Sequence, residues 1–463
     1  MRRVVQRPLL LVAFGVAALA GWLGLPPFPA GPGPAAVGVA PSGSAVISTA
    51  PDPSPTPIAS ASPSAGPGTT GTTGTTGTTG TTGSPGRPPL ASRSPRLGNL
   101  SATPSMRRTL DNWLPRLRAK AGIPGVSAAI IFPDGSMWVG ASGLADVATA
   151  RPVSPDTAFA VASVSKTFTA ALILALVEDG RIALDVPVVT YMPELAIDRR
   201  ITVRQLLDHS SGLRDFFSHK DIDAALQKSP GRRWDAADAL RYVGKPYFKP
   251  GAGWHYSNTN YLVLGLLAER IGGTSVAAQL RQRFIDPLGL ADTYYQALEQ
   301  PRGPTAHGYR FSGPGRTLPA IDLSDGTMVV PFTSVVTAAG AAGSIATSAG
   351  DLARWARALY GGSVLGPQMR KAMLAHVLRT IAYEPSTGYG LGVQVVTIDG
   401  HATLGHSGRL LGFSAVMRWL PDEGIAIVVL TNQSRTDPDI VLDGLLRIGL
   451  QHPSDCVTYP VQR

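Results

Sequence analysis

The sequence is poor in cysteine and lacks the short motifs that most often bind metals. Cys456, close to the C-terminus, is the single cysteine among 463 residues. One cysteine excludes an intramolecular disulfide and every cysteine-rich metal site. No His-Glu-x-x-His segment is present either. We therefore expect a core held together by packing, with no metal and no other cofactor.

The sequence also lacks the patterns of nucleic-acid-binding proteins, although it is basic. The formal net charge is +10, and residues 1–105 supply +5 of it through six arginines and one aspartate. No basic helix interleaved with aromatic residues and no zinc-finger spacing accompanies this charge. We expect no nucleic-acid partner. The excess charge fits a solvated basic surface, or one that meets anionic wall polymers or lipid headgroups.

The first 105 residues differ in composition from the rest. Residues 1–25 start with three arginines and continue with the uncharged run Leu9–Leu25, a pattern typical of an export signal. The run has 17 residues, the short limit of a membrane span, so a cleaved signal and an N-terminal membrane anchor both stay open. Residues 26–105 are rich in Pro, Ser, Thr, Ala and Gly and indicate a flexible linker. We expect an exported protein, extracellular or in the cell envelope, that meets a membrane only through its N-terminal segment.

Residues 106–452 have the patterning of one folded domain, followed by a tail at 453–463. Its beginning predicts an amphipathic helix and then a hairpin around a Pro-Asp-Gly turn. A mostly helical middle follows, and the end of the domain predicts further strands. Strands at both ends and helices between them fit one α/β layer with a helical insertion. The elements predicted at the two ends are a helix at Arg107–Ala121 and strands at Val126–Phe132, Met137–Ala141, Gly392–Thr397, Phe413–Leu420 and Ile425–Thr431.

Ser163 and Lys166 stand at the start of a long apolar helix, predicted at Ser163–Asp179. Residues three apart share one face of a helix, so the hydroxyl and the amine lie side by side. The positive helix end and burial both lower the pKa of such an amine. A neutral lysine can then take the proton of the serine and activate it as a nucleophile. The alternative is an N-capping serine followed by a surface lysine, but an apolar helix gives a charged side chain no solvated place.

Two later segments contain candidate partners. Tyr256 follows a Pro-Gly-rich loop, and a phenol near a cationic lysine loses its proton more easily and can act as a general base. Asn258 can hold a substrate amide, or it can simply cap a turn. His209 is expected to be structural, whereas the sequence leaves the role of His255 undecided.

His406, Ser407 and Gly408 precede the strand predicted at Phe413–Leu420. Gly408 permits a close approach of the backbone to a ligand. The backbone N–H of Arg409 is a candidate oxyanion-hole donor, paired with the N–H of the catalytic serine. A surface histidine is the alternative for His406.

Together these segments resemble a known superfamily. Ser-x-x-Lys, Tyr-x-Asn and His-x-Gly are similar in order and spacing to the three motifs of the penicillin-binding and β-lactamase superfamily. The flanking segments 201–213 and 388–392 resemble it as well, and the similarity covers about 106–450. Tyrosine in the second motif and histidine in the third are most similar to Streptomyces-type D-alanyl-D-alanine carboxypeptidases and related esterases.

The resemblance implies an antiparallel sheet flanked by helices, with an all-helical insertion subdomain. It implies that Ser163 forms an acyl-enzyme, that Lys166 and Tyr256 move the proton, and that Asn258 and residues 406–409 bind the substrate. The implied substrates are cell-wall peptides of the D-Ala-D-Ala type and β-lactams, with peptidoglycan as a partner. An esterase or a β-lactamase acting through the same site is the alternative, and a non-catalytic penicillin-sensing or wall-binding protein is a second one.

One segment departs from the carboxypeptidase pattern. Carboxypeptidases of this type have an arginine soon after Gly-Tyr-Gly-Leu-Gly, which binds the terminal carboxylate of the substrate. Here that place reads Val393-Gln394-Val395. Arg409 is either a replacement through a bidentate contact or a solvated residue at the rim, so an amidase or esterase activity stays open.

Overall fold

A computed structural model describes residues 100–450 except 312–319, 326–328, 381–386 and 435–436. The predicted signal or anchor at 1–25, nearly all of the predicted linker at 26–105 and the tail at 453–463 lie outside the described residues. Within the described part of the chain, no helix combines the length and apolar character needed to cross a membrane.

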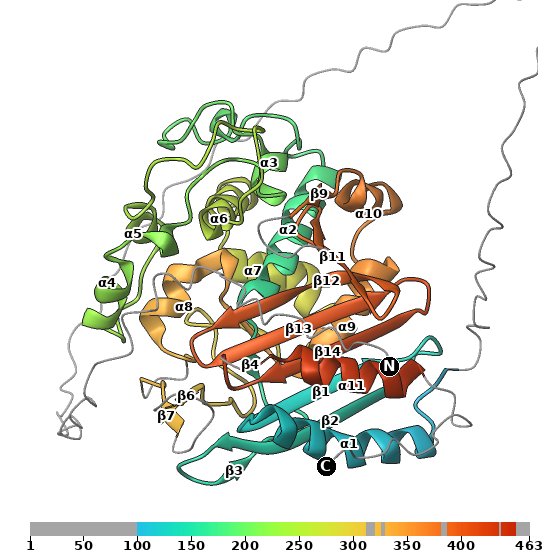
Figure 1. Cartoon of the computed structure of the whole chain (residues 1–463). Coiled ribbons are helices and arrows are strands. Elements are labelled where there is room, and N and C mark those ends of the chain that lie inside the picture. The colour runs from blue at the N-terminus through green and yellow to red at the C-terminus, as the bar shows by residue number, and fades with distance from the viewer. Residues whose placement is uncertain (1–99, 312–319, 326–328, 381–386, 435–436, 451–463) are drawn as a thin grey trace, which may run out of the picture. The chain divides into compact units, whose positions relative to one another are not determined.

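A nine-stranded antiparallel sheet forms the centre of the domain (Figure 1). Strands from both ends of the domain meet in it, because β1 pairs with β14 from Val126–Thr431 to Ile131–Ala426. The predicted α/β layer built from both chain ends is thereby confirmed. The strands, in spatial order, are β3 (Arg151–Pro152), β2 (Met137–Asp146), β1 (Gly125–Ile131), β14 (Ile425–Thr431), β13 (Phe413–Leu420), β12 (His401–Leu410), β11 (Gln394–Ile398), β10 (Thr387–Tyr389) and β9 (Leu378–Arg379).

Helices cover both faces of the sheet. Helices α1 (Pro104–Ala121) and α11 (Asp439–Leu450) pack together on one face, and α9 (Ala349–Gly361) packs against β1, β13 and β14 on the other (Figure 1). The two faces correspond to two separate apolar cores. Helix α1 begins at Pro104, three residues before the predicted start at Arg107, after the capping residue Thr103.

The predicted apolar helix is α2 (Ser165–Glu178), and it runs through the larger core. Every residue from Ser165 to Leu176 is buried, as expected of a helix that is apolar on all sides. A short 3₁₀ turn, Ala162–Val164, precedes it. The helix therefore starts two residues later than predicted, and Ser163 lies in the 3₁₀ turn.

The middle of the chain is mostly helical and lies beside one end of the sheet (Figure 1). It also contains two small sheets that the sequence did not indicate: β4 (Phe159–Ala160), β8 (Ile345–Thr347) and β5 (Tyr294–Tyr295) form one, and β6 (Tyr309–Phe311) with β7 (Ala320–Asp322) forms the other. The remaining helices are α3 (Val203–Leu207), α4 (Ile222–Lys228), α5 (Ala236–Leu240), α6 (Asn258–Gly272), α7 (Val276–Leu280), α8 (Thr333–Ala339) and α10 (Pro367–Leu374).

Candidate active site

Ser163 and Lys166 lie side by side, one turn apart. The Lys166 Nζ is 3.1 Å from the Ser163 Oγ. The turn that holds Ser163 follows Ala162, whose φ of 49° lies in the left-handed region that non-glycine residues seldom adopt. Backbone conformations of this kind are often found at functional sites, where surrounding structure has to hold them in place.

Lys166 is fully buried and has three hydrogen-bond acceptors around its amine. Besides Ser163, these are the Asn258 Oδ1 at 2.8 Å and the Ala342 carbonyl oxygen at 2.9 Å. Burial lowers the pKa of Lys166 to about 7, and the charge of Asp215 opposes this shift. An ammonium donates to all three acceptors, whereas a neutral amine donates to two and accepts from a third group. Neutral Lys166 can therefore keep its bonds to Asn258 and Ala342 and accept the proton of Ser163.

The lowered pKa of Lys166 predicts a pH dependence of stability. The unfolded chain keeps this lysine protonated up to its ordinary pKa of 10.5, and the folded protein only up to about 7. Between these values the unfolded state binds more protons, so this residue makes the free energy of unfolding rise with pH. Urea unfolding of the wild type and of Lys166→Met from pH 6.5 to 10 measures the effect. The free energy of unfolding of the wild type, relative to that of the variant, should increase as pH rises. A difference between the two free energies that stays constant with pH contradicts the prediction.

Tyr256 is a buried residue at the end of the loop before α6, next to Lys166. Its ring centre is 4.9 Å from the Lys166 Nζ, and only 8% of its surface is exposed. His209, with a φ of 65°, fixes this loop: its Nδ1 accepts from the Ser257 N–H at 3.2 Å and from the Asn260 amide at 3.0 Å. Burial holds the pKa of His209 well below its usual range, which keeps the ring neutral and able to accept. His209 thus has the structural role expected from the sequence.

His255 lies on the outer side of the same loop. Its ring stacks on Tyr247 with ring centres 3.6 Å apart, and the residue is exposed. This position gives His255 no contact with the Ser163–Lys166 pair.

Asn258 is the first residue of α6, and its amide connects two buried charged groups. Its Oδ1 accepts from Lys166, and its Nδ2 donates to the Asp215 Oδ2 at 2.8 Å. The sequence predicted a substrate contact for this amide and did not single out Asp215. Asp215 caps a short 3₁₀ turn, Phe216–Ser218, and capping aspartates are usually exposed, so its sequence context gave no signal of burial.

His406 lies inside strand β12, although the sequence placed it before a strand. Its Nε2 pairs with the Tyr389 hydroxyl at 2.9 Å, and its Nδ1 lies at the Ser407 carbonyl oxygen. Burial first, and the charge of Lys166 second, lower the pKa of His406 to about 3, so the imidazole is neutral. The rings of His406 and Tyr256 have centres 6.4 Å apart. The direct hydrogen-bond partner of His406 is therefore Tyr389.

Gly408 brings β12 against the backbone of the catalytic turn. A Cβ at this position would lie 2.1 Å from the Val161 carbonyl oxygen and 3.1 Å from the Ser163 nitrogen. The close approach that we predicted for Gly408 is thus to the protein's own backbone. This approach places strand β12, which contains Arg409, beside the backbone of Ser163. The backbone N–H groups of Ser163 and Arg409 are the two donors expected of an oxyanion hole. Arg409 itself is exposed.

Gln394 occupies the place where the carboxypeptidase pattern has arginine, and it is buried. Its Oε1 accepts from the Ser407 N–H at 2.9 Å and from the Arg418 Nη1 at 3.0 Å. Arg418 is itself only 5% exposed. At the position where the carboxypeptidase pattern has arginine, this protein therefore has an amide that is hydrogen-bonded to its own residues, and no exposed cation.

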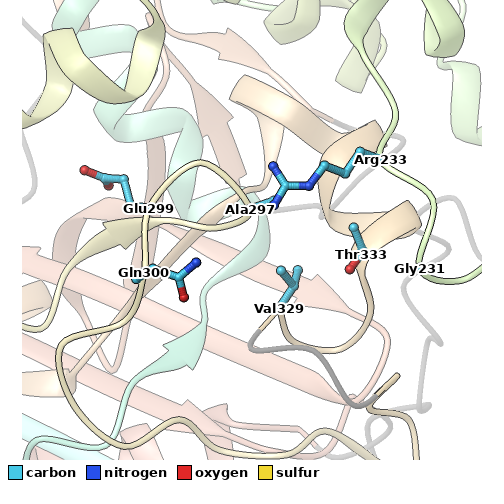
Figure 2. A pocket seen from close by; sticks show the side chains of 7 residues that line it. All are labelled: Gly231, Arg233, Ala297, Glu299, Gln300, Val329 and Thr333. Carbon is cyan, nitrogen blue, oxygen red and sulfur yellow. The ribbon is translucent and has the colours of Figure 1, made fainter. Parts of the chain in front are cut away.

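A pocket near the helical region lies apart from these residues. Figure 2 shows Arg233, Ala297 and Glu299 around it, and none of the predicted site residues lines it. It is therefore not the candidate active site.

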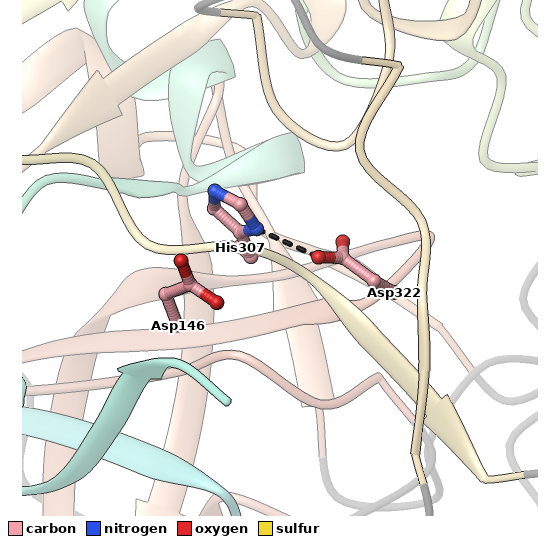
Figure 3. A group of neighbouring side chains, drawn as sticks. All are labelled: Asp146, His307 and Asp322. Carbon is pink, nitrogen blue, oxygen red and sulfur yellow. Dashed lines mark hydrogen bonds and ion pairs between the residues drawn. The ribbon is translucent and has the colours of Figure 1, made fainter. Parts of the chain in front are cut away.

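Asp146, His307 and Asp322 bring three possible metal-ligand atoms within 4.8 Å of one another, the one such group among the described residues (Figure 3). The His307 Nδ1 pairs with the Asp322 Oδ2 at 2.7 Å, and this bond raises the pKa of His307. Asp146 is bound by the hydroxyl and backbone of Thr149. The ion pair between His307 and Asp322 therefore lies within the β6–β7 segment, and the backbone N–H of His307, which donates to the Ala145 carbonyl oxygen at 2.8 Å, joins this segment to the end of β2.

Comparison with known proteins identifies relatives that share this architecture. The beta-lactamase family model matches residues 110–450. Penicillin-binding protein 4* of Bacillus subtilis is 28% identical over 299 residues, which cover 63% of this chain and 64% of that protein. D-aminopeptidase of Cereibacter sphaeroides is 27% identical over 351 residues, which cover 75% of this chain and 63% of that protein. The chain thus spans less than two thirds of the length of either relative.

The fold also matches solved structures. A D-stereospecific amidohydrolase from Streptomyces sp. superposes with a TM-score of 0.63 at 27% identity, over 73% of this chain and 97% of that one. The antiparallel sheet flanked by helices is thereby confirmed. With a family model that matches well over half of its length, the chain belongs to the beta-lactamase family, a group of serine hydrolases related to the penicillin-binding proteins.

Proposed function

We propose that this protein is a serine hydrolase that works through an acyl-enzyme and cleaves the amide bond that follows a D-amino-acid residue. Its substrates are peptides of the D-Ala-D-Ala type or simpler D-amino-acid amides, and β-lactams acylate it. The observation that carries the proposal is the buried Lys166 amine, 3.1 Å from the Ser163 hydroxyl and with a pKa of about 7. A general base is most effective when its pKa lies near the working pH.

The proposed reaction has two steps. The Ser163 Oγ attacks the substrate carbonyl carbon while its proton passes to neutral Lys166, and the backbone N–H groups of Ser163 and Arg409 stabilise the oxyanion. The proton then passes to the leaving nitrogen, directly or through Tyr256, and the C–N bond breaks. Water next attacks the ester carbon and gives a proton to the same groups. The bond from the acyl carbon to the Ser163 Oγ then breaks, the proton passes to this oxygen, and the acid leaves.

An amidase or esterase that requires no free carboxylate on its substrate is the second candidate. The buried Gln394, bound to Ser407 and Arg418, favours it because the position offers no exposed cation for a terminal carboxylate. Arg409, which follows Ser407 and Gly408 in β12, is the exposed cation nearest to this position in the sequence of that strand. A non-catalytic binding protein is less consistent with the site, because burial of a lysine amine costs free energy and binding alone does not require it.

We further propose that the protein acts outside the cytoplasm, on wall peptides. The basis is the sequence of residues 1–25, followed by a linker long enough to hold the domain away from a membrane. No nucleic-acid partner is proposed.

A substrate panel tests the proposed activity on the purified protein. The panel consists of a D-Ala-D-Ala peptide, D-alaninamide, p-nitrophenyl acetate and nitrocefin, with L-alaninamide as the stereochemical control. We expect cleavage of D-substrates over the L-amide, and fast acylation by β-lactams followed by slow release. Cleavage of the amide but not of the peptide favours the second candidate. Rapid nitrocefin turnover without cleavage of either D-substrate contradicts the proposal.

A further inference from the structure

We propose that Asp215 is a positioning residue of this site, which fixes the orientation of the Asn258 amide and holds a negative charge beside the Lys166 amine. The inference goes beyond the proposed function and rests on it only for the chemical role of Lys166. It starts from a chain of three side chains in which a half-buried amide joins two buried groups: the amine donates to the amide oxygen at 2.8 Å, and the amide nitrogen donates to the carboxylate at 2.8 Å.

The chemistry of a carboxylate determines which way this amide points. An ionised carboxylate only accepts hydrogen bonds, and a lysine ammonium only donates them. Asn258 satisfies both neighbours in one orientation alone, with its NH₂ toward Asp215 and its oxygen toward Lys166. The second oxygen of Asp215 accepts from the Phe217 N–H at 3.1 Å, so the carboxylate is itself fixed by the backbone.

Asp215 is also the one acidic group found to act on the charge of Lys166. Burial lowers the pKa of Lys166, and the charge of Asp215 raises it. Burial also raises the pKa of Asp215, whereas the bond from the Phe217 N–H, the charge of Lys166 and the bonds from Asn258 lower it and favour the ionised carboxylate. The other titratable groups that face the amine are His209, His406 and the rings of Tyr256 and Tyr261. Burial keeps both histidines neutral, so neither adds a second positive charge beside the amine.

The proposed role has a direct consequence for Lys166. Without the carboxylate, the ammonium loses a favourable charge and the amide loses the partner that selects its orientation. Both losses favour the neutral amine. Removal of the charge at Asp215 should therefore lower the pKa of Lys166 and move the low-pH side of the acylation profile to lower pH. A role in packing alone predicts a loss of stability with no such movement.

Lysine NMR tests this without any need for activity. The protein has seven lysines, and Lys166 is the only buried one, all seven lying in the described part of the chain. With ¹³C-lysine labelling, the signal missing from Lys166→Arg identifies Lys166. In Asp215→Asn we expect its titration midpoint to fall by at least about one pH unit. Asp215→Ser removes the charge in a second way, and Asp215→Glu retains it and should keep the midpoint near the wild-type value.

Asp351→Asn is the matched control. Asp351 is also a buried carboxylate, only 2% exposed, and it also accepts from a backbone N–H, that of Asp292 at 2.8 Å. It is not among the groups that act on Lys166. A midpoint in the neutral Asp215 variants that moves no further than in this control overturns the inference.

The pH profile of acylation by a fluorescent penicillin gives the second measurement. Its low-pH midpoint should move down in Asp215→Asn by the same amount as in the NMR titration. If the wild type forms no acyl-enzyme with any probe, the proposed function fails, and the NMR result still decides the role of Asp215. If the wild type is acylated and neither midpoint moves, only the role of Asp215 fails.

Discussion

Replacing Ser163 by alanine should abolish covalent labelling by a fluorescent penicillin, with a loss of at least about a thousandfold in acylation rate. The reason is the geometry at the start of α2, where Ser163 has the one serine hydroxyl bonded to the Lys166 amine. No other serine among the described residues shares this bond. Gel fluorescence after timed exposure to the probe, together with intact mass of the adduct, measures the effect.

Ser165→Ala is the matched control for this prediction. Ser165 lies two residues further along, and its hydroxyl accepts from the Ile345 N–H at 3.0 Å. Residues two apart do not face the same side of a helix. The control should retain the label, although with some loss of stability because a buried N–H loses its acceptor. Labelling of Ser163→Ala at the wild-type rate shows that the nucleophile lies elsewhere.

Gly408→Ala should lower the acylation rate about a hundredfold while the protein stays folded. The added Cβ would lie 2.1 Å from the Val161 carbonyl oxygen, and no atoms tolerate that distance, so β12 has to move away from the catalytic turn. A displacement of about 1 Å in a catalytic site costs about a hundredfold in rate. The thermal unfolding midpoint should fall as well, because the strand pairing and the core beside it are strained.

The control for the glycine prediction is Gly231→Ala. Gly231 has open space around the position of a Cβ and no positive φ, so its substitution tests only the general effect of alanine in place of glycine. Its acylation rate should match the wild type. Unchanged acylation in Gly408→Ala contradicts the view that β12 has to touch the Ser163 backbone for the reaction to occur.

Local patterns predicted the parts of the site that depend on neighbours in sequence. The Ser163–Lys166 contact follows from residues three apart at a helix start, and it is observed at 3.1 Å. The β1–β2 hairpin follows from two strand-like segments on either side of the turn Pro133 to Gly135, and Ala128 pairs with Gly140 in it. In both cases the interacting residues lie within one turn or one hairpin, so the chain has few other ways to arrange them.

Strand β12 shows where such patterns fail. Its residues from His401 to Leu410 include two glycines and several polar side chains, which disfavour a strand by propensity. It forms because β13 pairs with it from Leu404 to Leu410 and β11 pairs with its first half. The sequence therefore placed His406 ahead of the strand at Phe413–Leu420, and it did not predict the hydrogen bond of His406 to Tyr389.

The sequence by itself determined the sheet built from both chain ends, the three motifs, and the pair of a serine with a buried lysine. Only the tertiary structure decided what surrounds that lysine. Ala342, which accepts from Lys166, lies 176 residues after it. Asp215, which accepts from Asn258, lies 43 residues before that asparagine. No local pattern links positions so far apart. Their contacts arise from the packing of separate elements around one buried amine, and burial is the condition that turns an ordinary ammonium into a base near neutral pH.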